Sequence, residues 1–174
     1  IATYMIGTAS WFTIHRDNAD CTAIRYEITD WNERQYLSES ELNALLRAAN
    51  LHPVGHKRSE ICTQEIEDAI LTCPMVRTAQ CFAETNGDIL VKINQRIPLV
   101  RIITPAESYF VDTDRKIMPI RSSVRDQVII ADGNIGKRMA INELADFIEW
   151  LKNNGYWQER IASIHVRSPK DIYL

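Results

Sequence analysis

The chain has 174 residues, of which 45% are hydrophobic and 25% charged, with a formal net charge of -3. This composition indicates a soluble globular protein that can bury a core, as one large domain or two small ones. Lys and Arg form no run longer than two residues, so charge gives no case for nucleic-acid binding.

The amino-terminal stretch is apolar but short. Residues Ile1 to Phe12 carry no charged side chain and end in two aromatic residues before the sequence turns polar. Aromatic residues are typical of the membrane–water interface, whereas twelve helical residues span only ~18 Å of a hydrocarbon core that is ~30 Å thick. We interpret residues 1–20 as the outer end of a membrane anchor with its linker. A helix or strand packed on the core is the alternative.

Five elements are predicted between residues 23 and 97, in the order β-α-α-β-β. Apolar side chains at alternate positions, as in Ile24, Tyr26 and Ile28, are typical of a strand with one buried face. Ser38 followed by Glu41 forms a capping box, which predicts where the first helix begins. The predicted elements are a strand at Ala23–Trp31, helices with the N-caps Ser38 and Thr63, and strands at Val76–Thr85 and Ile89–Ile97.

A tight hairpin is predicted between the last two of these strands. Asn86-Gly87 favours a type I′ turn, because Asn and Gly tolerate the positive φ that both central positions need. Pro98 lacks a backbone donor, so the second strand ends, bulges or lies at an edge there. We expect a joint between two domains at Arg96, Ile97, Pro98 and Leu99.

The residues after Pro98 predict a second unit of short strands with one packed helix, so the fold class is α+β. Its helix is indicated by apolar residues at helical spacing between Met139 and Leu151. The expected domains are residues 21–98 and 99–174. The predicted strands are Val100–Ile103, Tyr109–Val111, Lys116–Ile120, Gln127–Ala131, Ile161–Val166 and the opening of one more at Lys170–Leu174.

No catalytic, cofactor or metal site is predicted. His52 and His56 are four residues apart, but Pro53 and Gly55 exclude the regular helix that would bring both onto one face. Two other patterns fail on spacing or composition, a calcium loop at Asp112–Asp114 and a P-loop at Gly133–Lys137. The sequence therefore gives little support for an enzyme or for a small-molecule substrate.

The four cysteines do not form a recognisable framework. No pair has the C-x-x-C spacing of zinc ribbons and thioredoxin-like proteins. An even number permits two disulfides with three connectivities, and we expect all four thiols to be reduced. They are Cys21, Cys62, Cys73 and Cys81.

The order of the elements, together with the residues at the turns between them, resembles that of a known family. The first unit resembles a POTRA domain, in which Pro74–Cys81 looks like the turn from the second helix into the second strand. The series Asn94–Ile102, Tyr109–Asp112 and Lys116–Pro119 resembles the bacterial cell-division family FtsQ (DivIB), where the third POTRA strand leads into a β domain. The similarity extends from about Ala23 to Leu174.

This resemblance implies a function without an active site. FtsQ proteins have one inner-membrane helix and a periplasmic POTRA plus β domain, and they recruit or stabilise septal division proteins. The implied partners are single-span proteins of the FtsB and FtsL type and other divisome membrane proteins. The family implies further strands after residue 174, so we expect the chain to be cut at both ends. We expect partner binding near Lys170, Asp171, Ile172, Tyr173 and Leu174.

Another class of POTRA protein is the alternative. Components of outer-membrane assembly or secretion systems also carry POTRA domains, usually as tandem repeats or with a membrane β-barrel. This sequence contains neither pattern, so the cell-division interpretation is favoured.

Overall fold

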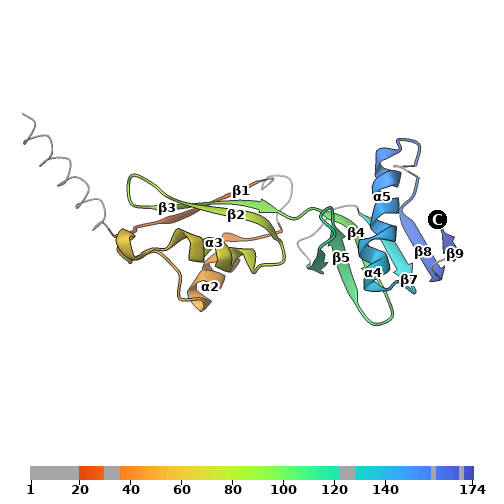
Figure 1. Ribbon diagram of the computed structural model, residues 1–174, viewed down its shortest axis with the longest axis horizontal. Coiled ribbons are helices and arrows are strands. Elements are labelled where there is room, and N and C mark those ends of the chain that lie inside the picture. Colours follow the sequence, from red (N-terminus) through yellow and green to blue (C-terminus); the bar gives the residue numbers. More distant parts are fainter. Residues whose placement is uncertain (1–19, 30–35, 122–127, 158–159, 169–170) are drawn as a thin grey trace, which may run out of the picture. The chain divides into compact units, whose positions relative to one another are not determined.

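The computed structural model describes residues 20–29, 36–121, 128–157, 160–168 and 171–174 (Figure 1). The chain divides into two compact units, which meet in the sequence between Gln95 and Arg96. The expected membrane anchor at residues 1–20 lies, except for its last residue, outside the described part.

The first unit has the predicted β-α-α-β-β order. Its central strand is β3, which pairs parallel with β1 on one side and antiparallel with β2 on the other. Helices α2 and α3 lie on the same side of this sheet (Figure 1). The elements are β1 (Ile24–Ile28), α2 (Glu39–Ala48), a 3-10 turn (Arg58–Glu60), α3 (Thr63–Leu71), β2 (Val76–Ala83) and β3 (Ile89–Gln95).

Side-chain and backbone caps determine where α2 begins and ends. The Glu41 backbone N–H donates to Ser38 Oγ at 3.3 Å, and the Ser38 N–H donates to the Glu41 carboxylate at 3.1 Å, which confirms the capping box. At the other end Asn50 has φ 56°, and the Leu51 N–H donates to the Leu46 carbonyl at 2.8 Å, as in a Schellman motif. The predicted N-cap of α3 is wrong by one residue, because Thr63 is already helical.

The hairpin between β2 and β3 exists, but its predicted type I′ turn is wrong. Gly87 has φ 94°, whereas Asn86 is not among the residues with positive φ. The Glu84 N–H donates to the Asp88 carbonyl at 2.8 Å, and the Gly87 N–H donates to Glu84 at 3.2 Å. This is a three-residue loop with a left-handed glycine. The longer loop lets the Asp88 carboxylate accept hydrogen bonds from Thr22 and Ala23, at 2.7 and 3.0 Å.

The second unit is a mixed six-stranded sheet in the order β6-β5-β4-β7-β8-β9. Strands β4, β7 and β8 run parallel, and the other neighbouring pairs are antiparallel. The strands are β4 (Pro98–Ile103), β5 (Ser108–Asp112), β6 (Ile117–Pro119), β7 (Ile129–Gly133), β8 (Ser163–Ser168) and β9 (Asp171–Tyr173). The two prolines occupy positions that lack a regular ladder, Pro98 at a register shift and Pro119 in an edge strand.

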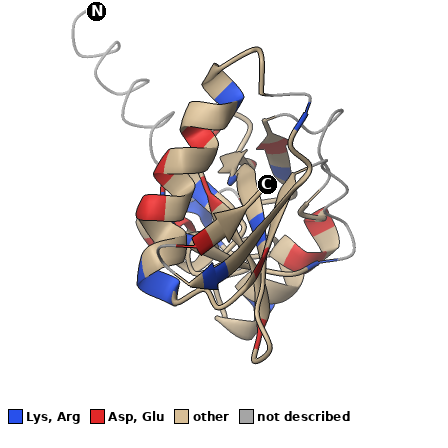
Figure 2. Ribbon diagram, turned by 90° about the vertical axis from the view of Figure 1, so that its right-hand side faces the viewer, with Lys and Arg blue, Asp and Glu red and all other residues tan. Residues whose placement is uncertain are grey.

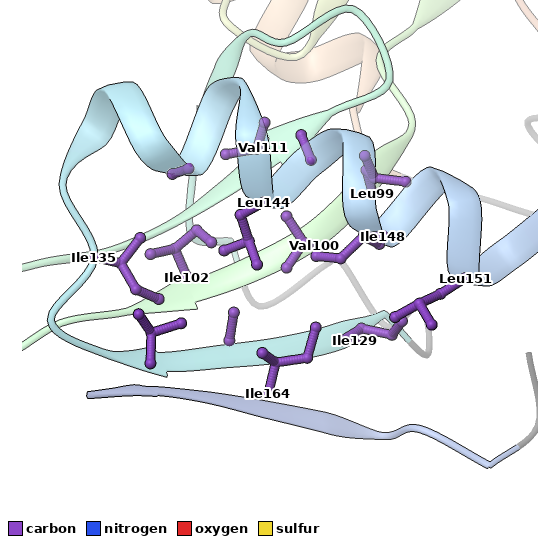
Figure 3. Packing of buried hydrophobic residues seen from close by; sticks show 14 of the residues in the cluster. Leu99, Val100, Ile102, Val111, Ile129, Ile135, Leu144, Ile148, Leu151 and Ile164 are labelled. Carbon is purple, nitrogen blue, oxygen red and sulfur yellow. The ribbon is translucent and has the colours of Figure 1, made fainter. Parts of the chain in front are cut away.

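The helix predicted between Met139 and Leu151 is bent into two. Helix α4 (Lys137–Ile141) ends and α5 (Glu143–Asn153) begins at Asn142, which has φ -111° and ψ -93°. Helix α5 covers the buried face of β4, β7 and β8 (Figure 3). The fully buried residues at this contact include Val100, Ile102, Ile164, Leu144, Ile148 and Leu151.

Gly133 lies where two strand backbones meet closely. It has φ 107°, and a Cβ atom there would come within 2.2 Å of the Val166 carbonyl oxygen on β8. The Asn134 N–H donates to this same oxygen at 2.7 Å. The position therefore requires glycine for its backbone conformation and for the space beside β8.

Candidate functional site

Strand β9 is the outermost described strand on one side of the second sheet. It pairs with β8 alone among the described strands, in a register that joins Tyr173 to His165 and Ile172 to Val166. The backbone N–H and C=O groups on the far side of an edge strand have no ladder partner. Such a row of donors and acceptors can accept an added strand from another chain.

The side chains of β9 continue both faces of the sheet outward. Ile172 is opposite Val166, which is 0% exposed and belongs to the core, yet Ile172 itself is 40% exposed. Tyr173 is 52% exposed, and its ring centroid lies 6.3 Å from that of His165. The edge thus offers apolar surface on one face and an aromatic ring on the other.

The described charged groups near β9 are of both signs and form no patch of a single charge. Asp171 Oδ2 lies 3.9 Å from Arg167 Nη1, and the Tyr173 hydroxyl donates to the same carboxylate at 3.4 Å. His165 pairs with Asp132 on the neighbouring strand β7. Acidic and basic segments are interspersed on the ribbon of the second unit (Figure 2). Leu174 is exposed at the end of β9, and Lys170 lies outside the described residues.

The four residues of the predicted joint all belong to the second unit. Arg96 Nη1 lies 2.8 Å from Asp112 Oδ2, and the Ile97 carbonyl accepts the Thr113 N–H at 3.3 Å. Pro98 begins β4, and Leu99 is 1% exposed in the core under α5. The chain therefore enters the second unit at Arg96.

The Asp112 carboxylate holds the chain in place where it enters the second unit at Arg96. It is 1% exposed, and besides Arg96 it accepts the Lys116 backbone N–H at 2.6 Å. A buried charge is tolerated when it is paired and hydrogen-bonded in this way. This bond also closes the turn between β5 and β6.

His52 and the four cysteines, which carry the side chains suited to metal binding or nucleophilic chemistry, all lie in the first unit. His52 Nε2 lies 3.3 Å from Asn43 Oδ1, and burial, Arg47 and His56 together lower the His52 pKa. The four cysteines are free thiols. Across the described ranges, no three His, Cys, Asp or Glu side chains form a group that could hold a metal ion. Within the same part of the chain, no helix is long and apolar enough to cross a bilayer.

The contacts Asp132–His165 and Glu67–Cys81 depend on how strands and helices are placed in the fold. The Asp132–His165 pair requires the register of two parallel strands that are thirty-three residues apart in sequence. The Cys81 N–H donates to Glu67 Oε1 at 2.6 Å, a contact between a helix and a strand edge. The available signal for the second contact was an acidic residue beside the apolar stripe of α3.

Comparison with protein families agrees with this division of the chain. Residues 19–94 match the POTRA-like domain family. Residues 97–174 match the family described as FtsQ/DivIB, C-terminal related. No curated protein matches the chain.

The protein is thus a POTRA-domain protein, with the β-α-α-β-β unit as its first domain. More particularly, this POTRA-like domain is followed by an FtsQ/DivIB C-terminal-related domain. The family indicates a role related to cell division, and its members are generally not enzymes.

Proposed function

We propose that this protein is a non-enzymatic scaffold of the bacterial divisome. It recruits or stabilises septal division proteins on the periplasmic side of the inner membrane, to which a single amino-terminal anchor attaches it. The observation that carries this proposal is that β9 is the outermost described strand of an FtsQ/DivIB C-terminal-related domain.

The partner docks by adding a strand to β9. Main-chain hydrogen bonds to the outer side of Asp171–Tyr173 supply affinity, while side chains supply selectivity. An apolar partner residue beside Ile172 extends the core face of the sheet, because Ile172 already continues the row of Val166. The partner is a single-span protein of the FtsB or FtsL type.

A matched pair of substitutions tests this docking edge. Ile172 in β9 and Ile117 in β6 lie in the two opposite edge strands, and each is 40% exposed. We expect Ile172→Asp to weaken binding of the periplasmic segment of the organism's FtsB-type protein by tenfold or more in calorimetry. Ile117→Asp should leave this affinity unchanged.

Three outcomes contradict the docking edge. They are equal effects of both substitutions, no effect of either, and no binding of that segment to the unmodified protein. Circular dichroism must show that both variants are folded.

A cellular experiment distinguishes the scaffold from the alternative class of POTRA protein. Depletion of a divisome scaffold should produce filamentous cells that grow but fail to form septa. Loss of outer-membrane β-barrel proteins at normal cell length would instead identify an assembly or secretion component.

A further inference from the structure

The first sheet has an edge strand that is longer than β9. Among the described strands, β2 (Val76–Ala83) pairs with β3 alone. The Glu84 N–H points toward β3, because it donates to Asp88 across the hairpin at 2.8 Å. Since alternate residues of an antiparallel strand point their N–H groups to opposite sides, Ala79, Cys81 and Ala83 point theirs away from β3.

One of these outward donors is already occupied. The Cys81 N–H donates to Glu67 Oε1 at 2.6 Å, and Glu67 projects from α3. A hydrogen bond to a carboxylate is stronger than one between neutral groups. The carboxylate also lies close to the Cys81 thiol, where burial and then the Glu67 charge raise the pKa of Cys81 to about 12.

The surroundings of this bond would otherwise favour strand addition. The sequence of β2 contains one charged residue, Arg77, in eight positions. Phe82 on β2 is 46% exposed and Leu71 at the end of α3 is 44% exposed. An edge strand with low charge, exposed apolar side chains and free backbone donors is prone to pair with another chain.

We propose that Glu67 is an edge guard, which keeps β2 from pairing with β2 of a second copy of this chain. Antiparallel self-pairing can place Cys81 on a two-fold axis, with Ala79 opposite Ala83 of the other copy. That ladder needs the Cys81 N–H, which Glu67 occupies. The guard acts whether or not the protein is a divisome scaffold, since it concerns the other domain and another edge.

The first test measures self-association. Glu67→Ala removes the acceptor, and Glu65→Ala is the matched control, because Glu65 is an exposed glutamate on the same helix. We expect Glu67→Ala to form dimers at concentrations at least tenfold below those at which the unmodified protein or Glu65→Ala self-associates, measured by sedimentation velocity. Adding Ala83→Pro, which removes an outward donor of β2, should restore the monomer.

The second test measures the guarded bond directly. In hydrogen exchange at a concentration where the protein is monomeric, the Cys81 amide should exchange at least tenfold faster in Glu67→Ala. Glu67→Gln keeps an oxygen acceptor and should preserve most of the protection. The inward amides of Gln80 and Phe82 should be unchanged in both variants, which separates loss of the guard from loss of the sheet.

Each result of these two tests either supports or overturns the role of Glu67 as a guard. An unchanged Cys81 exchange rate in Glu67→Ala overturns the guard, as does a Glu67→Ala protein that is no more prone to dimerise than Glu65→Ala. A dimer that persists with Ala83→Pro also overturns it, because the association then uses another surface. If Glu67→Ala does not fold, the Cys81 amide is measured in the other two proteins. Rapid exchange of this amide in the unmodified protein overturns the guard. Slow exchange that is retained in Glu67→Gln supports it.

Discussion

The edge strands of the two sheets differ in what lies beside them. In the first domain a carboxylate from α3 occupies an outward donor of β2. In the second domain β9 has exposed side chains on both faces, and the helix of that domain covers β4, β7 and β8. An α3 side chain thus reaches the outer side of β2, whereas we propose that the outer side of β9 accepts a partner strand.

The largest loss of stability is expected from a substitution of Gly133, which tests whether the two sheets are independent of each other. Gly133→Val places a branched side chain at φ 107° and against the Val166 carbonyl, so β8 must move away from β7. We expect the second domain to lose about 3 kcal/mol or more of its free energy of unfolding. Chemical denaturation followed by hydrogen exchange should show this loss in β8 and β9.

In that variant the amides of β2 and β3 should keep their protection, because they belong to the first unit. Equal loss of protection in both domains would show that the two sheets unfold together. The independence of the two edges would then be wrong.

A smaller loss of stability is expected from a substitution of Gly87, which tests the sheet of the first domain. Gly87→Val forces a branched residue into the left-handed region, at φ 94° in the loop that sets the register of β2 and β3. We expect a loss of about 1 to 2 kcal/mol in the first domain, measured by urea denaturation. Asn86→Ala, at the neighbouring position without positive φ, is the control. A larger effect at Asn86 than at Gly87 would contradict the observed turn.

The smallest effect is a difference in pH dependence. The pKa of His52 in the folded state lies below its ordinary value near 6.5, mainly because of burial and then Arg47 and His56. The unfolded chain therefore binds a proton more readily, so this contribution to stability is present above pH ~6.5 and is lost as the pH falls toward the folded pKa. His52→Gln should flatten the stability curve of the first domain below pH ~6.5. An unchanged curve would show that His52 is not the titrating group.

Local signals in the sequence predicted much of the fold. The Ser38–Glu41 capping box, the alternation in β3 and the effect of Pro98 are each decided within a few residues, and all are seen in the structure. The turn type was not predictable, because Asp88 is also bound by Thr22 and Ala23, more than sixty residues earlier. Likewise, nothing in the helical spacing of residues 139–151 reports the bend at Asn142.

The candidate docking site was predictable only in part. The strand at the end of the chain was expected from its sequence, but its place at a sheet edge depends on the order of all six strands. The guard at Glu67 depends on a contact across fourteen residues between a helix and a strand. Such contacts become visible only when the register of the sheet is known.

The parallel pairing of β1 with β3 has a consequence for how the first domain is made. Ile24 pairs with Ile89, so β1, the first described strand, cannot form this pairing until a segment 65 residues later has left the ribosome. At ~5–20 residues per second, β1 waits roughly 3–13 s while the two helices and β2 are synthesised. During that interval the backbone donors and acceptors of β1 lack the strand that they pair with in the folded domain.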